Sequence, residues 1–222
     1  MKHWKTDIQA VLDRDPATTS KLEVMLCCPG YKAIRRHRRA HFFYKHNMRF
    51  IARYIAERTR RKTGVDIHPG ATIGEGFFID HGTGVVIGET TVIGKNCSIF
   101  QNATLGGTGK DTGKRHPTLG DNVMVSAGAK VLGPFTVGDN SKIGAGAVVL
   151  SEVPPNSTVV GVPGRVVRRG NIKVDYSMDQ RLPDPIKEEL QRLCSRIGEL
   201  ERKIKGMHNK IQENNFKEKD DI

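Results

Sequence analysis

Residues 66–105 read DIHPGATIGEGFFIDHGTGVVIGETTVIGKNCSIFQNATL, and a branched apolar residue recurs there every six positions. The positions that keep this period, here and further along the chain, are Ile67, Ile73, Ile79, Val85, Ile87, Ile93, Ile99, Leu105, Leu119, Val125, Val131, Val137, Ile143 and Val149. A six-residue period fits neither a helix nor an alternating strand, but it is the repeat of a parallel β-helix. The pattern predicts a β-helix domain over residues 65–170 whose branched apolar side chains point inward.

The period slips at two places. It shifts by two residues shortly after Asp80 and His81. The step from Leu105 to Leu119 is 14 residues, two repeats plus two, and it spans the polar, glycine-rich segment 106–117. Because loops on a rigid scaffold often carry function, we expect segment 106–117 to leave the coils as a loop. We expect both slips to mark the places where the residues that carry the chemistry lie.

The regions on either side of the repeats have a different pattern. Residues 1–64 are predicted to be a helical N-terminal domain, with helices over 7–12, from a Ser20 capping box onward, and over 31–62. Residues 171–222 are predicted to be a linker, a helix and a flexible tail. The expected fold class is therefore mainly β with α.

The C-terminal region carries a second periodicity. Apolar residues alternate there at steps of four and three, at Ile186, Leu190, Leu193, Ile197, Leu200, Ile204, Met207 and Ile211. This is a heptad seam, with Glu and Lys prominent at the other positions. Two interpretations stay open: a coiled coil between subunits, which the seam favours, and an amphipathic helix that packs on its own β-helix.

Charge and composition limit the class of protein. The net charge is +12, and the excess lies mostly in residues 32–62. Three interpretations of this segment stay open. It could be a patch that binds nucleic acid or an acidic membrane, it could attract an anionic cofactor, or it could be a solvated helix whose apolar residues dock on a surface that the sequence does not identify, these residues being Ile34, Phe42, Met48, Ile51 and Ile55. The docked helix is favoured, so neither nucleic acid nor a membrane is expected as a partner.

The four cysteines show no metal or disulfide spacing, and no apolar run is long enough to cross a membrane. The first residues lack the apolar stretch of a secretory signal. We therefore expect a protein of the reducing cytoplasm.

Two polar clusters are candidates for chemistry. Asp66 and His81 are 15 residues apart, close to one coil of about 18, so neighbouring coils would bring them together. A carboxylate that orients a histidine raises the basicity of the ring, as a general base requires. The second cluster is Arg115-His116 at the end of the predicted loop. The histidines form no closely spaced set for a metal, so none is expected.

The chain resembles the serine O-acetyltransferase family. The resemblance rests on the blocks DIHP, DHGTG, GGTGK and RHP in this order, on the later GAGAVVLSEVPPNSTVVGVPGRVV, and on DIQAVLDRDPA near the N-terminus. It covers residues 5–170 and implies a left-handed parallel β-helix, trimers with active sites between neighbouring prisms, and acetyl transfer from acetyl-CoA to the hydroxyl of L-serine. The product would be O-acetylserine, on the way to cysteine.

The resemblance also implies residue roles. His81 would be the general base and Asp66 its orienting partner, with neither a metal nor an acyl-enzyme. Arg115 and His116 would hold the substrate carboxylate, and Asp15 and Asp80 would face its ammonium group. Acetyl-CoA would lie along a second set of residues, which are Gly107, Thr108, Ala127, Lys142 and Ala145.

Assembly and partners are expectations of the same kind. The helical N-terminal part is shorter than in hexameric members of the family, which favours a homotrimer. The terminal Ile222 would enter the active site of O-acetylserine sulfhydrylase as a partner enzyme. Other interpretations remain: an acetyltransferase for a sugar or another hydroxyl acceptor, a γ-class carbonic anhydrase, or a scaffold without activity.

Overall fold

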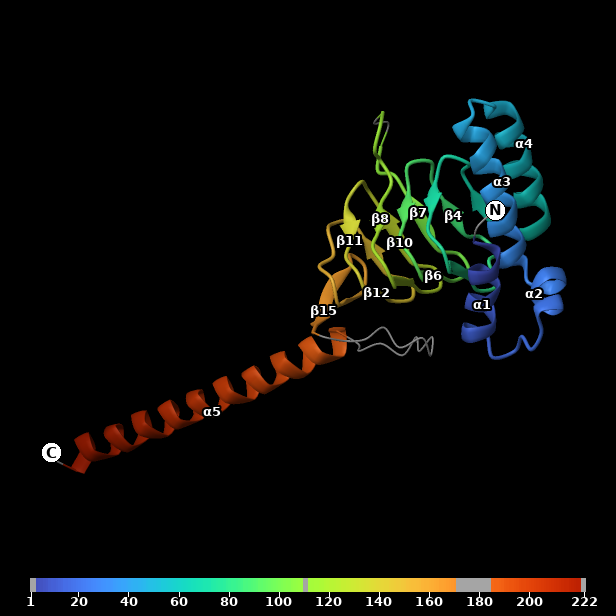
Figure 1. Ribbon diagram of the computed structural model, residues 1–222. Coiled ribbons are helices and arrows are strands. Elements are labelled where there is room, and N and C mark those ends of the chain that lie inside the picture. The colour runs from blue at the N-terminus through green and yellow to red at the C-terminus, as the bar shows by residue number, and fades with distance from the viewer. Residues whose placement is uncertain (1–2, 110–111, 171–184, 221–222) are drawn as a thin grey trace. The chain divides into compact units, whose positions relative to one another are not determined.

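A computed structural model describes residues 3–109, 112–170 and 185–220, with the side chains of 169, 185–188 and 207–220 outside the description. Contacts divide the chain into two units, Met1–Leu182 and Pro183–Ile222, which are described separately. The first unit is a prism of stacked β coils with helices at its N-terminal end (Figure 1).

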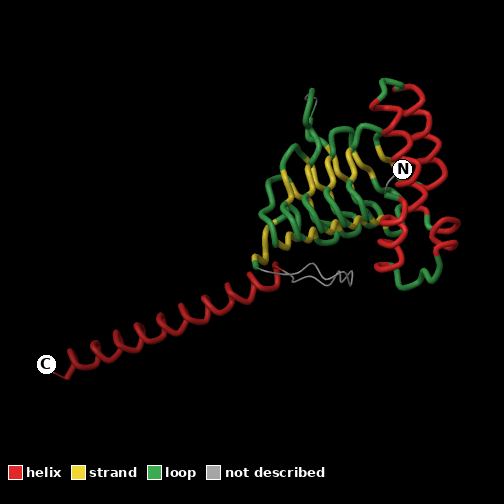
Figure 2. The backbone as a smooth tube through the Cα atoms, viewed as in Figure 1, coloured by secondary structure: helices red, strands yellow, loops and turns green. Residues whose placement is uncertain are grey.

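Short parallel strands form the three faces of the prism (Figure 2). Sheet A contains β1 (Asp66–Ile67), β4 (Val86–Ile87), β7 (Thr104–Gly106), β10 (Lys130–Leu132) and β13 (Val148–Val149). Sheet B contains β2 (Thr72–Ile73), β5 (Val92–Ile93), β8 (Thr118–Leu119) and β11 (Thr136–Val137). Sheet C contains β3 (Phe78–Ile79), β6 (Ser98–Ile99), β9 (Met124–Val125), β12 (Lys142–Ile143), β14 (Ser157–Val160) and β15 (Arg165–Arg169). The chain visits A, B and C in turn, so each coil has an A/B, a B/C and a C/A corner.

Strand pairing explains both slips of the period. Asp66 pairs with Val86, so the first coil has 86 − 66 = 20 residues. Lys130 pairs with Thr104 across a coil of 130 − 104 = 26 residues, and with Val148 across a regular coil of 148 − 130 = 18. The two extra residues lie in the C/A corner after β3. The eight extra residues lie in the A/B corner between β7 and β8, so this step is one repeat plus eight rather than two repeats plus two.

The predicted inward residues form the core. All the positions of the six-residue period are at most 9% exposed, and all belong to one continuous hydrophobic cluster. Burying a branched aliphatic side chain contributes about 1.5–3 kcal/mol, so the stacked rows account for the stability of the prism. The coils end where β15 pairs antiparallel with β14.

Four helices precede the prism: α1 (Trp4–Arg14), α2 (Lys21–Cys27), α3 (Pro29–Lys45) and α4 (Arg49–Thr63). The Ser20 cap is confirmed, because Ser20 Oγ accepts a hydrogen bond from Glu23 N. The prediction of one helix over 31–62 is wrong. The helix breaks at Asn47, which adopts a left-handed φ of 60°, and the chain turns back as α4.

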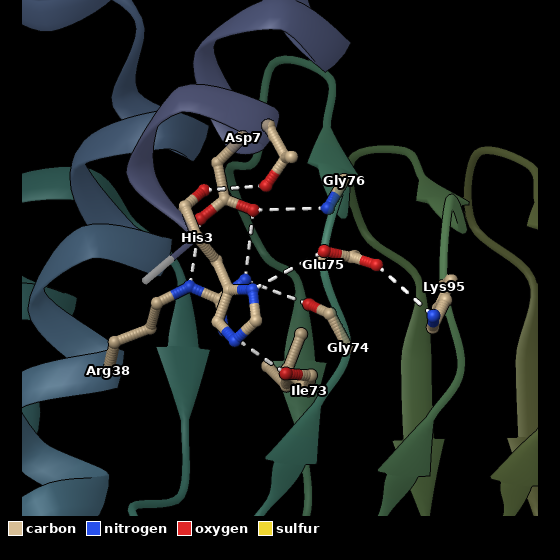
Figure 3. A network of polar contacts seen from close by, with 9 residues as sticks. His3, Asp7, Arg38, Ile73, Gly74, Glu75, Gly76 and Lys95 are labelled. Carbon is tan, nitrogen blue, oxygen red and sulfur yellow. Dashed lines mark hydrogen bonds and ion pairs between the residues drawn. The ribbon is translucent and has the colours of Figure 1, made fainter. Parts of the chain in front are cut away.

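Polar contacts fix the helices to the first coils (Figure 3). The buried Asp7 of α1 pairs with Arg38 of α3 at 2.8 Å and accepts a hydrogen bond from Gly76 N. Arg38 also donates to the carbonyl oxygens of Ile73 and Gly74. One ion pair therefore joins two helices to the B/C corner of the first coil.

The five apolar residues of the basic segment differ in their burial. Ile34 is 1% exposed, but Phe42, Met48 and Ile51 are 55%, 37% and 42% exposed. Ile55 is only partly buried. Within this chain, therefore, Ile34 docks on the first coils, and what the other four residues contact stays open.

The second unit contains one long helix, α5 (Pro185–Asp220), at the position of the predicted heptad seam. The seam residues with described side chains are 49–66% exposed. Ile186, Met207 and Ile211 lie outside the described side chains, and Ile222 lies outside the described residues.

Candidate active site

The C/A corner after β3 presents His81 to solvent. His81 has a φ of 54°, in the left-handed region, and the glycines at 82 and 84 share positive φ values. Every other non-glycine residue with positive φ in the described part of the chain is an asparagine. Left-handed backbone costs a histidine free energy and is found mostly where surrounding structure enforces it. The corner therefore holds an exposed imidazole in a fixed, unusual backbone conformation.

Asp66 lies on the coil edge beside this corner. Asp66 N donates to Val85 O at 2.9 Å, and Gly84 N donates to Gly64 O at 3.0 Å. The first and second coils thus bring the backbones of the two predicted partners together. Within the described residues, no hydrogen bond or ion pair joins the side chains of Asp66 and His81, so their pairing stays a prediction.

Asp15 lies between α1 and α2 in the helical region. It follows α1, and its carboxylate accepts hydrogen bonds from Ala17 N at 2.9 Å and Thr18 Oγ1 at 2.6 Å. Thr18 in turn contacts Cys28, the N-cap of α3. The next turn of α3 packs on the corner itself, where Gly30 leaves no room for a side chain against Ile79 O. A chain of contacts thus leads from Asp15 through Thr18 and Cys28 to the first turn of α3, which packs on the corner. Within the described residues, no hydrogen bond or ion pair joins Asp15 to Asp80 or His81, so their grouping stays a prediction.

Arg115 and His116 occupy a different place, the A/B corner at the end of the long loop. Thr90 holds both: its Oγ1 accepts hydrogen bonds from the backbone N of Arg115 at 3.0 Å and of His116 at 3.1 Å. His116 Nδ1 accepts from Thr90 N at 3.2 Å and lies 2.9 Å from Thr90 Oγ1.

Burial, followed by the charge of Arg115, lowers the pKa of His116. A neutral ring whose Nδ1 accepts hydrogen bonds carries its proton on Nε2. His116 is thus prepared to donate a hydrogen bond to an anion at this corner.

Two further residues contribute here, Glu89 of this corner and Tyr44 of α3. The sequence alone did not identify either of them as a site residue. Glu89 Oε2 accepts a hydrogen bond from Arg115 at 2.5 Å, and Glu89 Oε1 accepts one from Tyr44 of α3 at 2.8 Å. The hydrogen bonds from Tyr44 and Arg115 lower the pKa of Glu89. A charged Glu89 between these partners fixes the Arg115 guanidinium. In the sequence, the only indication of the role of Glu89 was that an acidic residue occupies the corner one coil before Arg115.

The two corners lie at opposite edges of sheet A. Residues 85–88, which include β4, separate them, and at about 3.3 Å per residue this spans roughly 13 Å. The two corners of one chain are therefore separate groups of side chains, with the width of sheet A between them. The structure thus places Asp80 and His81 at one corner and Arg115 and His116 at the other, and the grouping of Asp15 with the first corner stays a prediction.

The remaining predicted residues divide in the same way. Gly107 and Thr108 begin the long loop at the A/B corner and are exposed. Ala127 and Ala145 lie at C/A corners further along the prism, and Gly146 N donates to Ala127 O at 2.9 Å. Lys142 lies on β12 in sheet C. Each corner thus has its own exposed small residues.

Within the described residues, no group of three or more His, Cys, Asp or Glu side chains is arranged to hold a metal ion. None of the described helices has both the length and the apolar character that a membrane span requires.

The fold and its loop define a class: transferases built from six-residue repeats. Residues 116–151 match the family model described as "Bacterial transferase hexapeptide (six repeats)", and residues 1–36 match "Serine acetyltransferase, N-terminal". The chain is 52% identical over 210 residues to a serine acetyltransferase of Bacillus subtilis, covering 94% of this chain and 97% of that protein. The chain belongs to the serine acetyltransferase family, and its prism is a left-handed parallel β-helix.

Solved structures of serine acetyltransferases are similar to this chain in both sequence and fold. The serine acetyltransferase of Neisseria gonorrhoeae in complex with serine is 45% identical, with a TM-score of 0.72 over 74% of this chain and 67% of that chain. The enzyme of Brucella abortus in complex with coenzyme A is 48% identical, with a TM-score of 0.73 over 75% of this chain and 67% of that chain.

Proposed function

We propose that this chain transfers the acetyl group of acetyl-CoA to the hydroxyl of L-serine, with His81 as the general base. Membership of the family, with relatives solved in complex with serine and with coenzyme A, supports the reaction and both substrates. The exposed imidazole in its enforced backbone conformation supports the role of His81. The product, O-acetylserine, is a precursor for cysteine biosynthesis.

The chemistry needs a base and no metal. A serine hydroxyl is a weak nucleophile at neutral pH, and a positioned base typically adds about 10²–10⁴ to the rate. His81 takes the hydroxyl proton as the serine oxygen attacks the thioester carbon. The new C–O bond forms, the C–S bond breaks, and the proton passes to the coenzyme A thiolate. Asp66 would orient the ring, as its place on the neighbouring coil permits.

The assignment of serine is carried by the charged side chains at the two corners, which would suit a zwitterion. Asp80 precedes His81 at one corner, Asp15 would join it, and an ammonium group would be their natural ligand. Arg115 and His116 both present donors, which suit a carboxylate. Serine between these corners would place its hydroxyl beside His81.

Because the two corners of one chain lie on opposite edges of sheet A, serine would bind between two chains. The C/A corner of one prism would face the A/B corner of the next. Head-to-tail contacts of this kind generate a closed ring when the rotation between neighbours closes, and a ring of three prisms is the assembly that the resemblance implies. We therefore propose a homotrimer with three sites, each made by two subunits.

Acetyl-CoA would run along the same boundary. Ala127 and Ala145 offer a row of small side chains beside His81, where an extended pantetheine arm can lie against backbone. Gly107 and Thr108 of the facing chain, with Lys142, would complete the channel. Binding of Ile222 to O-acetylserine sulfhydrylase and a cytoplasmic location stay predictions.

An acceptor panel tests the function. The protein is incubated with acetyl-CoA and serine, threonine, homoserine or a set of sugars, and free thiol is followed. We expect turnover with L-serine and little with sugars. Turnover restricted to sugars would replace this proposal with the alternative of a sugar acetyltransferase.

A further inference from the structure

Helix α5 exposes an unbroken apolar row. Every third or fourth residue of its described part is a large aliphatic that is about half exposed: Leu190 54%, Leu193 49%, Ile197 54%, Leu200 52% and Ile204 66%. Single exposed aliphatics are common on proteins, but a continuous row of this length marks a contact surface.

As an isolated helix in water, α5 has features that lower its stability. Gly198 and Gly206 lie within it, with no heavy atom within 4 Å of where a Cβ would be. Each glycine costs a helix about 1 kcal/mol relative to alanine, and helices in water depend on the packing of an apolar face. The stabilisation that α5 needs must come from a partner along its exposed row.

The spacing of the row identifies the partner. In heptad notation Leu190, Ile197 and Ile204 occupy position a, and Leu193 and Leu200 occupy position d. A row with this strict period is self-complementary, because each residue packs against its own copy in an adjacent helix. We propose that α5 binds the α5 of a second copy of this chain as a parallel, in-register coiled coil.

Charge favours the same register. Arg196 lies at position g and Glu201 at position e, and in a parallel coiled coil each g residue approaches the e residue five positions later on the neighbouring helix. Within the described part of α5, neither residue has an ion-pair partner in its own chain, whereas Arg192 pairs with Glu189 at 3.9 Å. Arg196 and Glu201 are thus available to pair between helices, on both sides of the seam.

Disulfide trapping in the full-length protein tests the seam. In a Cys194→Ser background, Leu193→Cys places a thiol at position d, and Ser195→Cys places one at position f on the opposite face. A disulfide needs Cα atoms within about 7 Å, which only the d position provides in a parallel, in-register pair. We expect mild oxidation to give interchain disulfides with Leu193→Cys and none above the background with Ser195→Cys. Equal trapping at both positions, or none at either, would overturn the proposal.

A charge exchange tests the register without touching the apolar row. Glu201→Arg should weaken the association of the helices, and adding Arg196→Glu should restore it. The readout is the rate of Leu193→Cys trapping, with acetyl transfer as evidence that the prism is intact. A double variant that traps no faster than the single variant would contradict the parallel register, and it would leave the proposed reaction unaffected.

Discussion

The histidine at position 81 occupies a backbone conformation that this chain otherwise gives to asparagine or glycine. Asn102 and Asn122, at other corners of the prism, have φ values of 59° and 57°. Asparagine tolerates this region because its short polar side chain bonds locally, whereas histidine gains less from it. The chain accepts a costlier residue at His81, and this is expected where the side chain has a function.

His81→Asn is therefore a precise test of the base, since it preserves the backbone and removes the imidazole. We expect kcat to fall by about 10²–10⁴, with little change in KM for acetyl-CoA. Steady-state kinetics with His46→Ala as a matched control, an exposed histidine away from both corners, measures the effect. Unchanged turnover would remove His81 from the mechanism.

Glu89 acts on the second corner through Arg115. Glu89→Gln weakens a charged hydrogen bond that fixes the guanidinium, and such bonds contribute about 1.5–3 kcal/mol. We expect KM for serine to rise about tenfold and KM for acetyl-CoA to stay constant. Glu57→Gln, which changes an exposed carboxylate of α4 paired with Arg60, is the control. A fall in kcat alone would contradict the positioning role.

Among the elements, α3 connects the helical domain to both corners. Its first turn packs on the corner of His81, and Tyr44 near its end holds Glu89. Between them His37 is buried against the first coil, and its Nδ1 has no hydrogen-bond partner within the described structure. Burial, and then the charges of His41, Arg38 and His68, lower the pKa of His37 to about 3.

This buried histidine predicts a dependence of stability on pH. The unfolded chain binds a proton at His37 below its ordinary pKa of 6.5, and the folded chain does so only near 3. Acid therefore favours unfolding between these values, by about 1.4 kcal/mol per pH unit. Denaturant unfolding of wild type and His37→Leu should diverge as the pH falls from 6.5. Parallel stability curves would contradict the burial of a neutral His37.

The sequence predicted the core well because each inward residue repeats a local rule. It failed at the break between α3 and α4, since Ile51 and Ile55 continue the apolar pattern while Asn47 reverses the chain. Tyr44 and Glu89 were missed because they are 45 residues apart and meet only after folding. The pairing of Asp66 with His81 was predicted by spacing and stays a prediction, and spacing alone did not show that their corner and that of Arg115 lie on opposite edges of sheet A.

At the scale of the whole molecule, we propose that one chain carries two half-sites. The acidic corner with His81 and the basic corner with Arg115 are rigid parts of the same prism, and β4 keeps them apart. The backbones of the two corners are roughly 13 Å apart across this sheet. Catalysis is therefore proposed to depend on contact between copies.

Complementation between inactive chains tests this claim most directly. His81→Asn and Arg115→Ala chains are co-expressed, and acetyl transfer to serine is measured against each variant alone. If each site combines two chains, equal and random mixing of the two single variants restores about one quarter of the wild-type activity. In a second mixture, equal amounts of wild type and of the chain with both substitutions would then also have about one quarter of the wild-type activity. The two-chain site is contradicted if the first mixture is no more active than the separate variants and the second has about one half of the wild-type activity, because each site would then lie within one chain.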